Sequence, residues 1–442
     1  MIRRKLPVVE LLLIVAWIGV GCYHPNPAPA PRAASAIDVP SYHSEYAAGR
    51  TLDEQAAVEL ALQNDFSLDA LARDIELARS QARVSGAFPD PELRVGQLSS
   101  HDLDGTLHSL ELGLRFSTPY VGERAATRDA DEARADLSQS ELIAEQIDRS
   151  DWVRLGFSQI VRLEGLVEIC HSEVQYRSQL LDLLRTQAAI NERTNIELVN
   201  AELELFNAQQ QLSKRENDLR TLQRSLAAAV GLETLPALEP VFEQRIELDR
   251  EQLLSEAFAA RPELLETSSN YRLSQARRHL ERVRTIPWIS FVEPSYRREY
   301  DEDNDETEHW AELRFGIALP IFNLGRVGVR AEELAMQRDL SRLRGIEGQI
   351  AIELDQALSE YRRLWDDNEQ FAATLTRLED QVRQTIELGR ANPEADPLDL
   401  IDLQLELLQV RRARVEFRAL LSQVRIDLLR AVGEIHSAQP PH

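Results

Sequence analysis

Two aspartates three residues apart, Asp399 and Asp402, form the clearest pair of matched functional groups in the sequence. They follow Pro397 at the start of a predicted helix, and this spacing places both carboxylates on one face of it. Paired carboxylates attract cations, and in channels they line cation pathways. Acidic residues also complement the dipole at a helix N-terminus without any further role. Both interpretations stay open for this pair.

A second group of candidate ligands lies in two polar segments. Asp301 to Glu308 is acidic and is followed by His309, while His101 and His108 flank the other segment. Carboxylates and imidazoles close together can bind metal ions. No ligand spacing repeats, however, and no second cluster supports the first, so we interpret both segments as solvated hairpin tips. The sequence predicts no metal site and no cofactor.

Motifs of enzymes are missing from the sequence. It contains no Gly-rich phosphate loop, no Gly-x-Ser-x-Gly, no Cys-x-x-Cys and no His-Glu-x-x-His. The net charge of −24 disfavours nucleic acid as a partner, because phosphates require a basic surface. We therefore expect a protein that is not an enzyme and does not bind nucleic acid.

The N-terminal segment predicts export. Basic residues at 3–5 precede an apolar run over 11–21, which is short for a transmembrane helix and typical of a signal peptide over 1–21. The run ends Gly-Val-Gly before Cys22, which resembles a bacterial lipobox and makes Cys22 the candidate lipid anchor. Ordinary cleavage with an incidental cysteine is the alternative. Residues 22–50 are rich in proline and predict an extended tether.

The rest of the chain repeats itself at an interval of roughly 200 residues, which is far longer than the period of a solenoid. Repeat 1 covers 51–231 and repeat 2 covers 249–433, with a linker at 232–248 and a tail at 434–442. The matching positions include Ala61 and Ala257, Pro91 and Pro287, Pro119 and Pro320, and Ala229-Val230-Gly231 and Ala431-Val432-Gly433. Two similar halves therefore form one body.

Each repeat predicts a helix, two strands and two long helices. A capping box of Thr51 and Glu54 opens the first helix, which we expect to run to Ser85. Period-two alternation of apolar residues predicts the strands. They lie near 92–98 and 109–118 in repeat 1 and near 289–298 and 310–319 in repeat 2, with polar connections at 99–108 and 301–309.

The long helices favour coiled-coil packing. The segment 122–189 contains no proline, and helical spacing of its apolar residues predicts a helix of about 100 Å. Alternating spacings of three and four follow over 198–226 and again over 400–428, as in coiled coils. The fold class is therefore mainly α with a small β part: duplicated long antiparallel coiled-coil helices plus two β-hairpins.

The four strands have one apolar face each and approach the length of membrane β-strands. Two hairpins cannot close a barrel, and an open edge is not tolerated in lipid. If these strands enter a membrane, several copies must therefore share one closed wall. The alternative is a soluble coiled-coil protein whose hairpins pack against its helices.

Several motifs together resemble the outer-membrane efflux family typified by TolC. The Pro-Asp-Pro-Glu-Leu and Leu-Pro-Ile-Phe-Asn elements are similar to its heavy-metal cation-efflux branch. The resemblance covers essentially the whole chain after the tether. It rests on Ala61-Leu62-Gln63-Asn64-Asp65 and its counterpart at 257–264, on Pro89-Asp90-Pro91-Glu92-Leu93, and on Leu319-Pro320-Ile321-Phe322-Asn323-Leu324-Gly325-Arg326.

This resemblance implies a homotrimer whose twelve strands form a β-barrel in the outer membrane and whose twelve helices form an α-barrel tunnel in the periplasm. It implies outer membrane lipid, a periplasmic adaptor (membrane fusion) protein and an inner-membrane pump of the RND type as partners. Substrates, heavy-metal cations or drugs, would pass passively. Asp399 and Asp402 would then form the periplasmic aperture. A duct for type I secretion and a soluble periplasmic scaffold are the alternatives.

Overall fold

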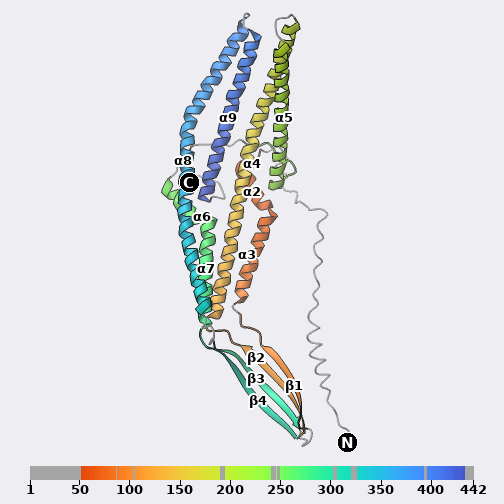
Figure 1. The fold of residues 1–442 in the computed structure, drawn as a ribbon, viewed down its shortest axis with the longest axis vertical. Coiled ribbons are helices and arrows are strands. Elements are labelled where there is room, and N and C mark those ends of the chain that lie inside the picture. Colours follow the sequence, from red (N-terminus) through yellow and green to blue (C-terminus); the bar gives the residue numbers. More distant parts are fainter. Residues whose placement is uncertain are drawn as a thin grey trace, which may run out of the picture. The chain divides into compact units, whose positions relative to one another are not determined.

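The computed structural model describes residues 51–85, 87–102, 105–189, 195–239, 245, 249–301, 306–319, 326–392 and 396–433. The predictions for 1–50, including the signal peptide and Cys22, and for the tail lie outside these residues. The elements of Figure 1 are α2 (Glu54–Asn64), α3 (Phe66–Ser85), β1 (Glu92–Asp102), β2 (Gly105–Ser117), α4 (Glu123–Ala189), α5 (Asn195–Val230), α6 (Arg250–Ala260), α7 (Pro262–Val283), β3 (Trp288–Asp301), β4 (Glu306–Ala318), α8 (Arg326–Ala391) and α9 (Pro397–Val432).

The order of elements confirms the duplication. Two short helices, two strands and two long helices follow one another in repeat 1 and again in repeat 2. The lengths match as well: α4 has 67 residues and α8 has 66, while α5 and α9 have 36 each. At 1.5 Å per residue, α4 is about 100 Å long, as predicted.

The first helix of repeat 1 is broken, so the prediction of one helix over 51–85 is wrong. Asp65 has an extended backbone, and its carboxylate accepts hydrogen bonds from the backbone N–H and the hydroxyl of Ser67 at the start of α3. Repeat 2 breaks at the equivalent place, where an extended Arg261 precedes Pro262. Each break separates one short helix from the next.

The predicted capping box is also wrong. Asp53 is the N-cap of α2, and its carboxylate accepts a hydrogen bond of 2.7 Å from the N–H of Ala56. Aspartate caps a helix at least as well as threonine, so Thr51 is not needed for this role. The Glu54 carboxylate instead forms an ion pair with Arg425 of α9.

The four strands form one antiparallel sheet in the order β1-β2-β3-β4. The two hairpins are joined because β2 pairs with β3, with Leu112 opposite Tyr296. The strands also run further than predicted: β1 reaches Asp102 and β2 begins at Gly105, so most of the expected polar connection belongs to the ladder. The backbone N–H and C=O groups of this segment form hydrogen bonds between the strands, and its polar side chains do not prevent this pairing. In the described chain β1 and β4 are the edges of the sheet.

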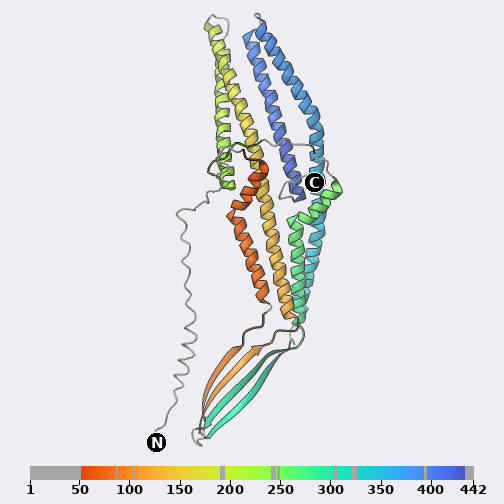
Figure 2. The same ribbon diagram turned by 180° about the vertical axis from the view of Figure 1, so that it is seen from behind.

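The helix α4 connects the two repeats. Near its N-terminus it packs small residues against α7, and near its C-terminus it packs against both α5 and α9 (Figures 1 and 2). The second long helix of this kind, α8, packs against α7 and α9 of its own repeat. Among the described helices, none is long and apolar enough to cross a membrane.

Each repeat has its own core where the short and long helices meet. The main buried residues occupy equivalent positions in the two repeats. In repeat 1 they are Phe157, Ile160, Leu226 and Val230, and in repeat 2 they are Leu358, Tyr361, Leu428 and Val432. The linker joins the first core, since Leu238 pairs with Leu52 in an isolated bridge. The duplication therefore extends from sequence to packing.

Candidate functional site

The sheet exposes its apolar residues and partly buries its polar ones. On β2, Leu112 and Leu114 are exposed, while Gly113 between them and Ser109 before them are buried. The predicted alternation is confirmed, and it defines an apolar face and a polar face. The large exposed residues of the apolar face are Leu93, Val95, Leu112, Leu114, Phe116, Ile289, Tyr296, Leu313, Phe315 and Ile317. A water-soluble sheet buries such a face, whereas a membrane barrel turns it to lipid.

Ion pairs crosslink the polar face across all four strands. Its centre is Glu293 of β3, whose side chain is 3% exposed. The carboxylate of Glu293 lies 3.7 Å from an Arg94 nitrogen of β1 and 3.5 Å from an Arg314 nitrogen of β4. Further ion pairs join Arg314 to Glu111, Arg297 to Glu111, and Arg297 to Glu312. The polar face is thus a lattice of alternating charges, each held by partners on neighbouring strands.

Another row of ion pairs links the repeats along α4 and α9. Arg162 donates two hydrogen bonds to the Glu416 carboxylate, at 2.6 and 2.8 Å. These bonds raise the pKa of Arg162 and lower the pKa of Glu416. Closer to the sheet-distal end, Arg412 donates to Glu173 at 2.9 Å. Charged side chains therefore hold the two repeats together where their long helices meet.

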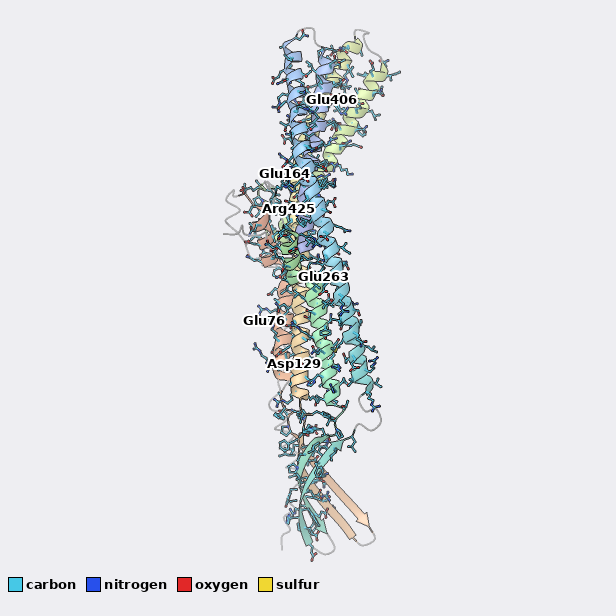
Figure 3. All side chains as sticks on the ribbon, turned by 90° about the vertical axis from the view of Figure 1, so that its left-hand side faces the viewer. Glu76, Asp129, Glu164, Glu263, Glu406 and Arg425 are labelled. Carbon is cyan, nitrogen blue, oxygen red and sulfur yellow. The ribbon has the colours of Figure 1, made fainter. Side chains whose placement is uncertain are left out.

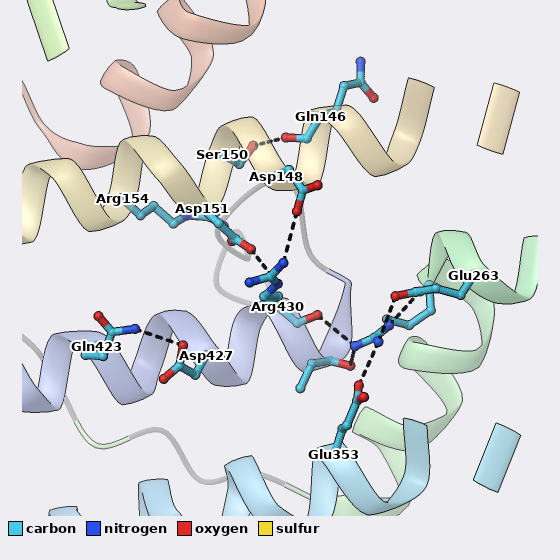
Figure 4. Close-up of polar contacts among 12 residues, drawn as sticks. Gln146, Asp148, Ser150, Asp151, Arg154, Glu263, Glu353, Gln423, Asp427 and Arg430 are labelled. Carbon is cyan, nitrogen blue, oxygen red and sulfur yellow. Dashed lines mark hydrogen bonds and ion pairs between the residues drawn. The ribbon is translucent and has the colours of Figure 1, made fainter. Parts of the chain in front are cut away.

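A buried carboxylate lies where the C-terminal end of α9 meets α4 (Figure 4). Asp151 is 4% exposed, and its two side-chain oxygens have no hydrogen-bond partner among the described residues. Nitrogens of Arg154 and Arg430 lie 3.6 and 3.5 Å from these oxygens. Burial outweighs their attraction and, with repulsion from Asp148 and Asp427, raises the pKa of Asp151 to about 6. This carboxyl therefore titrates near neutral pH.

The predicted pair Asp399 and Asp402 lies in the first turns of α9, and both side chains are exposed. Neither is the cap, because the Asp396 carboxylate accepts the hydrogen bond from the Leu398 N–H, at 2.9 Å. Partial burial raises the pKa of Asp402, and the charges of Asp399 and of Glu406, labelled in Figure 3, add to this effect. The sheet-distal end of α9 is therefore a concentrated negative surface.

Residues 57–232 match the model of a protein family described as outer membrane efflux protein. Over these residues the chain is similar to the outer membrane efflux proteins. The match covers most of repeat 1. The members of the family are channel proteins, not enzymes. The resemblance stated from the sequence motifs is thereby confirmed.

Individual members of the efflux family match over most of the chain. The cobalt-zinc-cadmium resistance protein CzcC of Cupriavidus metallidurans is 24% identical over 428 residues, which span 93% of this chain and 96% of that protein. The fold matches CusC with a TM-score of 0.68 and 17% identity, over 90% of this chain and 96% of CusC. The open MtrE channel of Neisseria gonorrhoeae matches with a TM-score of 0.69 and 16% identity, over 86% of this chain and 89% of MtrE.

The candidate metal ligands of the hairpin tips can be compared with the described side chains. Among the residues that the structure describes, no three His, Cys, Asp or Glu side chains come together as a metal site would require. The hydroxyl of Tyr296 and the Nδ1 of His309 share a hydrogen bond instead. Residues 302–305 of the acidic tip lie outside the described part of the chain.

Sequence reasoning missed the ion-pair lattice and the buried Asp151. Alternation along one strand places Glu293 and Arg314 on the polar face, but only the register between strands shows that they meet. For Asp151, a local signal existed, since Arg154 follows it by one helical turn. The burial of that pair, however, depends on α9, which is distant in sequence.

Proposed function

We propose that this protein is the outer-membrane exit duct of a tripartite efflux system. It conducts substrates passively from an inner-membrane pump, through a periplasmic adaptor protein, to the cell exterior. The observation that carries this proposal is the sheet, whose apolar face is exposed and whose polar face is crosslinked by ion pairs. Lipid suits the first face and a water-filled lumen suits the second.

The contacts between repeats suggest how copies close a ring. Inside one chain, β2 of repeat 1 pairs with β3 of repeat 2, and α4 packs on α9. The equivalent elements at the free ends are β4 and α8 on one side and β1 and α5 on the other. Repeating the internal contact between copies joins β4 to the next β1 and α8 to the next α5, in a closed head-to-tail ring. We propose the homotrimer of the predicted fold class, with twelve strands and a twelve-helix tunnel.

The direction of the strands orients this ring. The long helices α4 and α8 leave the sheet on the side opposite the hairpin turns, and α5 and α9 lie further out on that same side (Figure 1). With the tunnel in the periplasm, the turns face the cell exterior and the sheet spans the outer membrane. The signal peptide over 1–21 and an acylated Cys22 fit this location, because a lipid at the mature N-terminus would hold each copy at the membrane.

Heavy-metal cations are the proposed substrate class, and an RND-type pump is the proposed energy source. The relative CzcC, whose name refers to cobalt, zinc and cadmium resistance, supports this class. In the ring, Asp399 and Asp402 of every copy would surround the periplasmic aperture and favour cations. A soluble scaffold would leave the apolar face of the sheet without a partner, which argues against that alternative.

Fractionation and oligomer analysis test the proposal. The full-length protein should sediment with outer membrane, run as a trimer in detergent by light scattering, and form conducting pores in planar bilayers. The variant Leu114→Arg places a charge on the apolar face and should reduce membrane insertion, while Arg115→Gln on the polar face should insert normally. A chain that stays monomeric in buffer without detergent would overturn the proposal.

A further inference from the structure

The apolar face of the sheet ends in an arginine and two histidines on the side of the hairpin turns. Arg298 of β3 follows Tyr296 by two residues and therefore lies on the same face. His309 of β4 is directly opposite Arg298, and His108 of β2 lies on the diagonal, opposite Tyr300. Arg298, His309 and His108 are all exposed. We name these three residues the outward cationic patch.

The acidic residues of the sheet lie elsewhere. The registers place every glutamate of the strands on the polar face, as far as the structure describes their side chains. These glutamates are Glu92, Glu111, Glu293, Glu299, Glu306, Glu308 and Glu312. Arg94, Arg297 and Arg314 form ion pairs with them, whereas no described carboxylate pairs with Arg298. Among the side chains that the structure describes on this face there is no carboxylate, so an anion from outside the protein can pair with Arg298.

The height of the patch identifies the source of that anion. A bulge lies between Ile289 and Arg298 on β3, so the distance is counted on β4, where their partners Ile317 and His309 are eight residues apart, or about 27 Å at 3.4 Å per residue. With the strand tilt of roughly 40° that is usual in membrane barrels, the vertical height is about 21 Å, close to that of their apolar band. The patch therefore lies where acyl chains end and lipid headgroups begin.

Tyr296 has the placement of a membrane-interface aromatic. Its ring stacks on His309 with centroids 5.9 Å apart and an angle of 22° between the planes. The hydrogen bond between the Tyr296 hydroxyl and His309 Nδ1 leaves Nε2 as the ring nitrogen available to a ligand. Arg298 and His309 can thus present a planar guanidinium and an oriented imidazole side by side.

We propose that the outward cationic patch binds the phosphate groups of the phosphorylated glycolipid, lipid A, in the outer leaflet of the outer membrane. A guanidinium matches two phosphate oxygens at once, and His309 adds an N–H donor. The inference rests on the proposed function, because the patch reaches this leaflet only if the sheet spans the membrane with its turns outside. The bound lipid would fix the depth of the barrel in the membrane.

Lipid titration of the purified trimer tests this inference. Native mass spectrometry should show saturable binding of bisphosphorylated lipid A, and the double variant Arg298→Gln with His309→Gln should weaken it roughly tenfold or more. The matched control is Arg297→Gln, the neighbouring arginine on the polar face, which should leave lipid binding unchanged. Dephosphorylated lipid A should bind the wild type as weakly as the double variant, and inorganic phosphate should not replace the lipid.

The outcomes separate this inference from the function on which it rests. Equal binding by the wild type and the double variant, or equal loss in the Arg297→Gln control, overturns the patch while the trimer still conducts. Equal affinity for dephosphorylated lipid overturns it as well, because it makes the contact apolar. A wild-type protein that neither inserts nor conducts overturns the proposed function and the patch together.

Discussion

The last helices of the two repeats carry the same apolar stripe, but only one stripe is covered. In α9, Leu398, Ile401 and Leu408 are buried, and Leu398 packs against α4 and α5. The equivalent residues of α5 are exposed: Ile196 by 72%, Val199 by 59% and Phe206 by 54%. The contact between repeats thus forms once inside the chain, and in the proposed ring its second occurrence comes from another copy.

The ion pairs between the short helices and the long helix also differ between the repeats, because the signs of the charges are reversed. In repeat 1 acidic residues of the short helices meet arginines of α4, and in repeat 2 arginines of the short helices meet acidic residues of α8. The pairs are Glu54 with Arg154 and Asp65 with Arg149, against Arg250 with Asp355 and Arg261 with Glu353. Packing the short helices of one repeat on the long helix of the other would bring like charges together, so the reversal favours the correct partners.

A glutamate introduced into the apolar stripe of each helix should give the largest difference, because the α9 stripe stabilises the fold and the α5 stripe joins copies. Leu408→Glu places a carboxylate in the buried α9 contact and should cost more than about 4 kcal/mol, which unfolds repeat 2. Phe206→Glu at the exposed α5 position should leave the helical content of the chain intact and abolish the trimer. Circular dichroism and light scattering measure both effects. Gln209→Glu, on an exposed position of the same helix, is the control and should remain trimeric; a trimeric Phe206→Glu would refute the copy-to-copy stripe.

Reversing one of these charges should lower the free energy of unfolding almost as much as the Leu408→Glu change. Arg261 is buried and donates hydrogen bonds to Glu263, to Glu353 and to the last carbonyls of α9. Arg261→Glu should lower the free energy of unfolding by about 3–5 kcal/mol, because it leaves like charges together. The equivalent change at Arg250, which is 46% exposed, should cost far less, because water screens an exposed ion pair. Urea denaturation measures both values, and equal losses would show that burial does not control these pairs.

The buried Asp151 predicts a difference in pH dependence. Its folded pKa of about 6 lies above the ordinary value of 3.8, so the folded state binds a proton more tightly than the unfolded state. The contribution of Asp151 to stability should therefore be fully present below about pH 4 and fall by about 3 kcal/mol as pH rises through 6. Asp151→Asn should remove this loss in urea denaturation at several pH values. An exposed carboxyl on the same helix that does not act on Asp151 is the control, so Glu168→Gln should retain the wild-type slope.

Local patterns in the sequence predicted what depends on local spacing. The duplication, the long helices and the alternation of the strands all follow from the periodicity of side chains. The break at Asp65 was missed because neither proline nor glycine marks it; Arg149 of α4 contacts its carboxylate from far along the chain. Alternation likewise separates two faces of β2 without showing which one is exposed. That outcome depends on cross-strand partners such as Glu293 and Arg314, and hence on register.

The acidic end of α9 predicts the smallest effect on stability and a specific effect on conductance. Asp399 and Asp402 have no matching aspartate pair in α5, where Glu197 and Asn200 stand at the equivalent places. Both aspartates are exposed, so Asp399→Ala with Asp402→Ala should change the free energy of unfolding by less than about 0.5 kcal/mol.

In bilayer recordings the same double variant should raise leak conductance or lower the preference for cations, while Asn200→Ala should do neither. Acidification of the wild type should also lower cation preference, beginning at Asp402, because its raised pKa makes it take up a proton before an ordinary aspartate does. Unchanged conductance and selectivity in the double variant would remove these residues from the aperture. The carboxylates of α9 would then serve only the helix dipole, and the two repeats would contribute alike to the entrance of the tunnel.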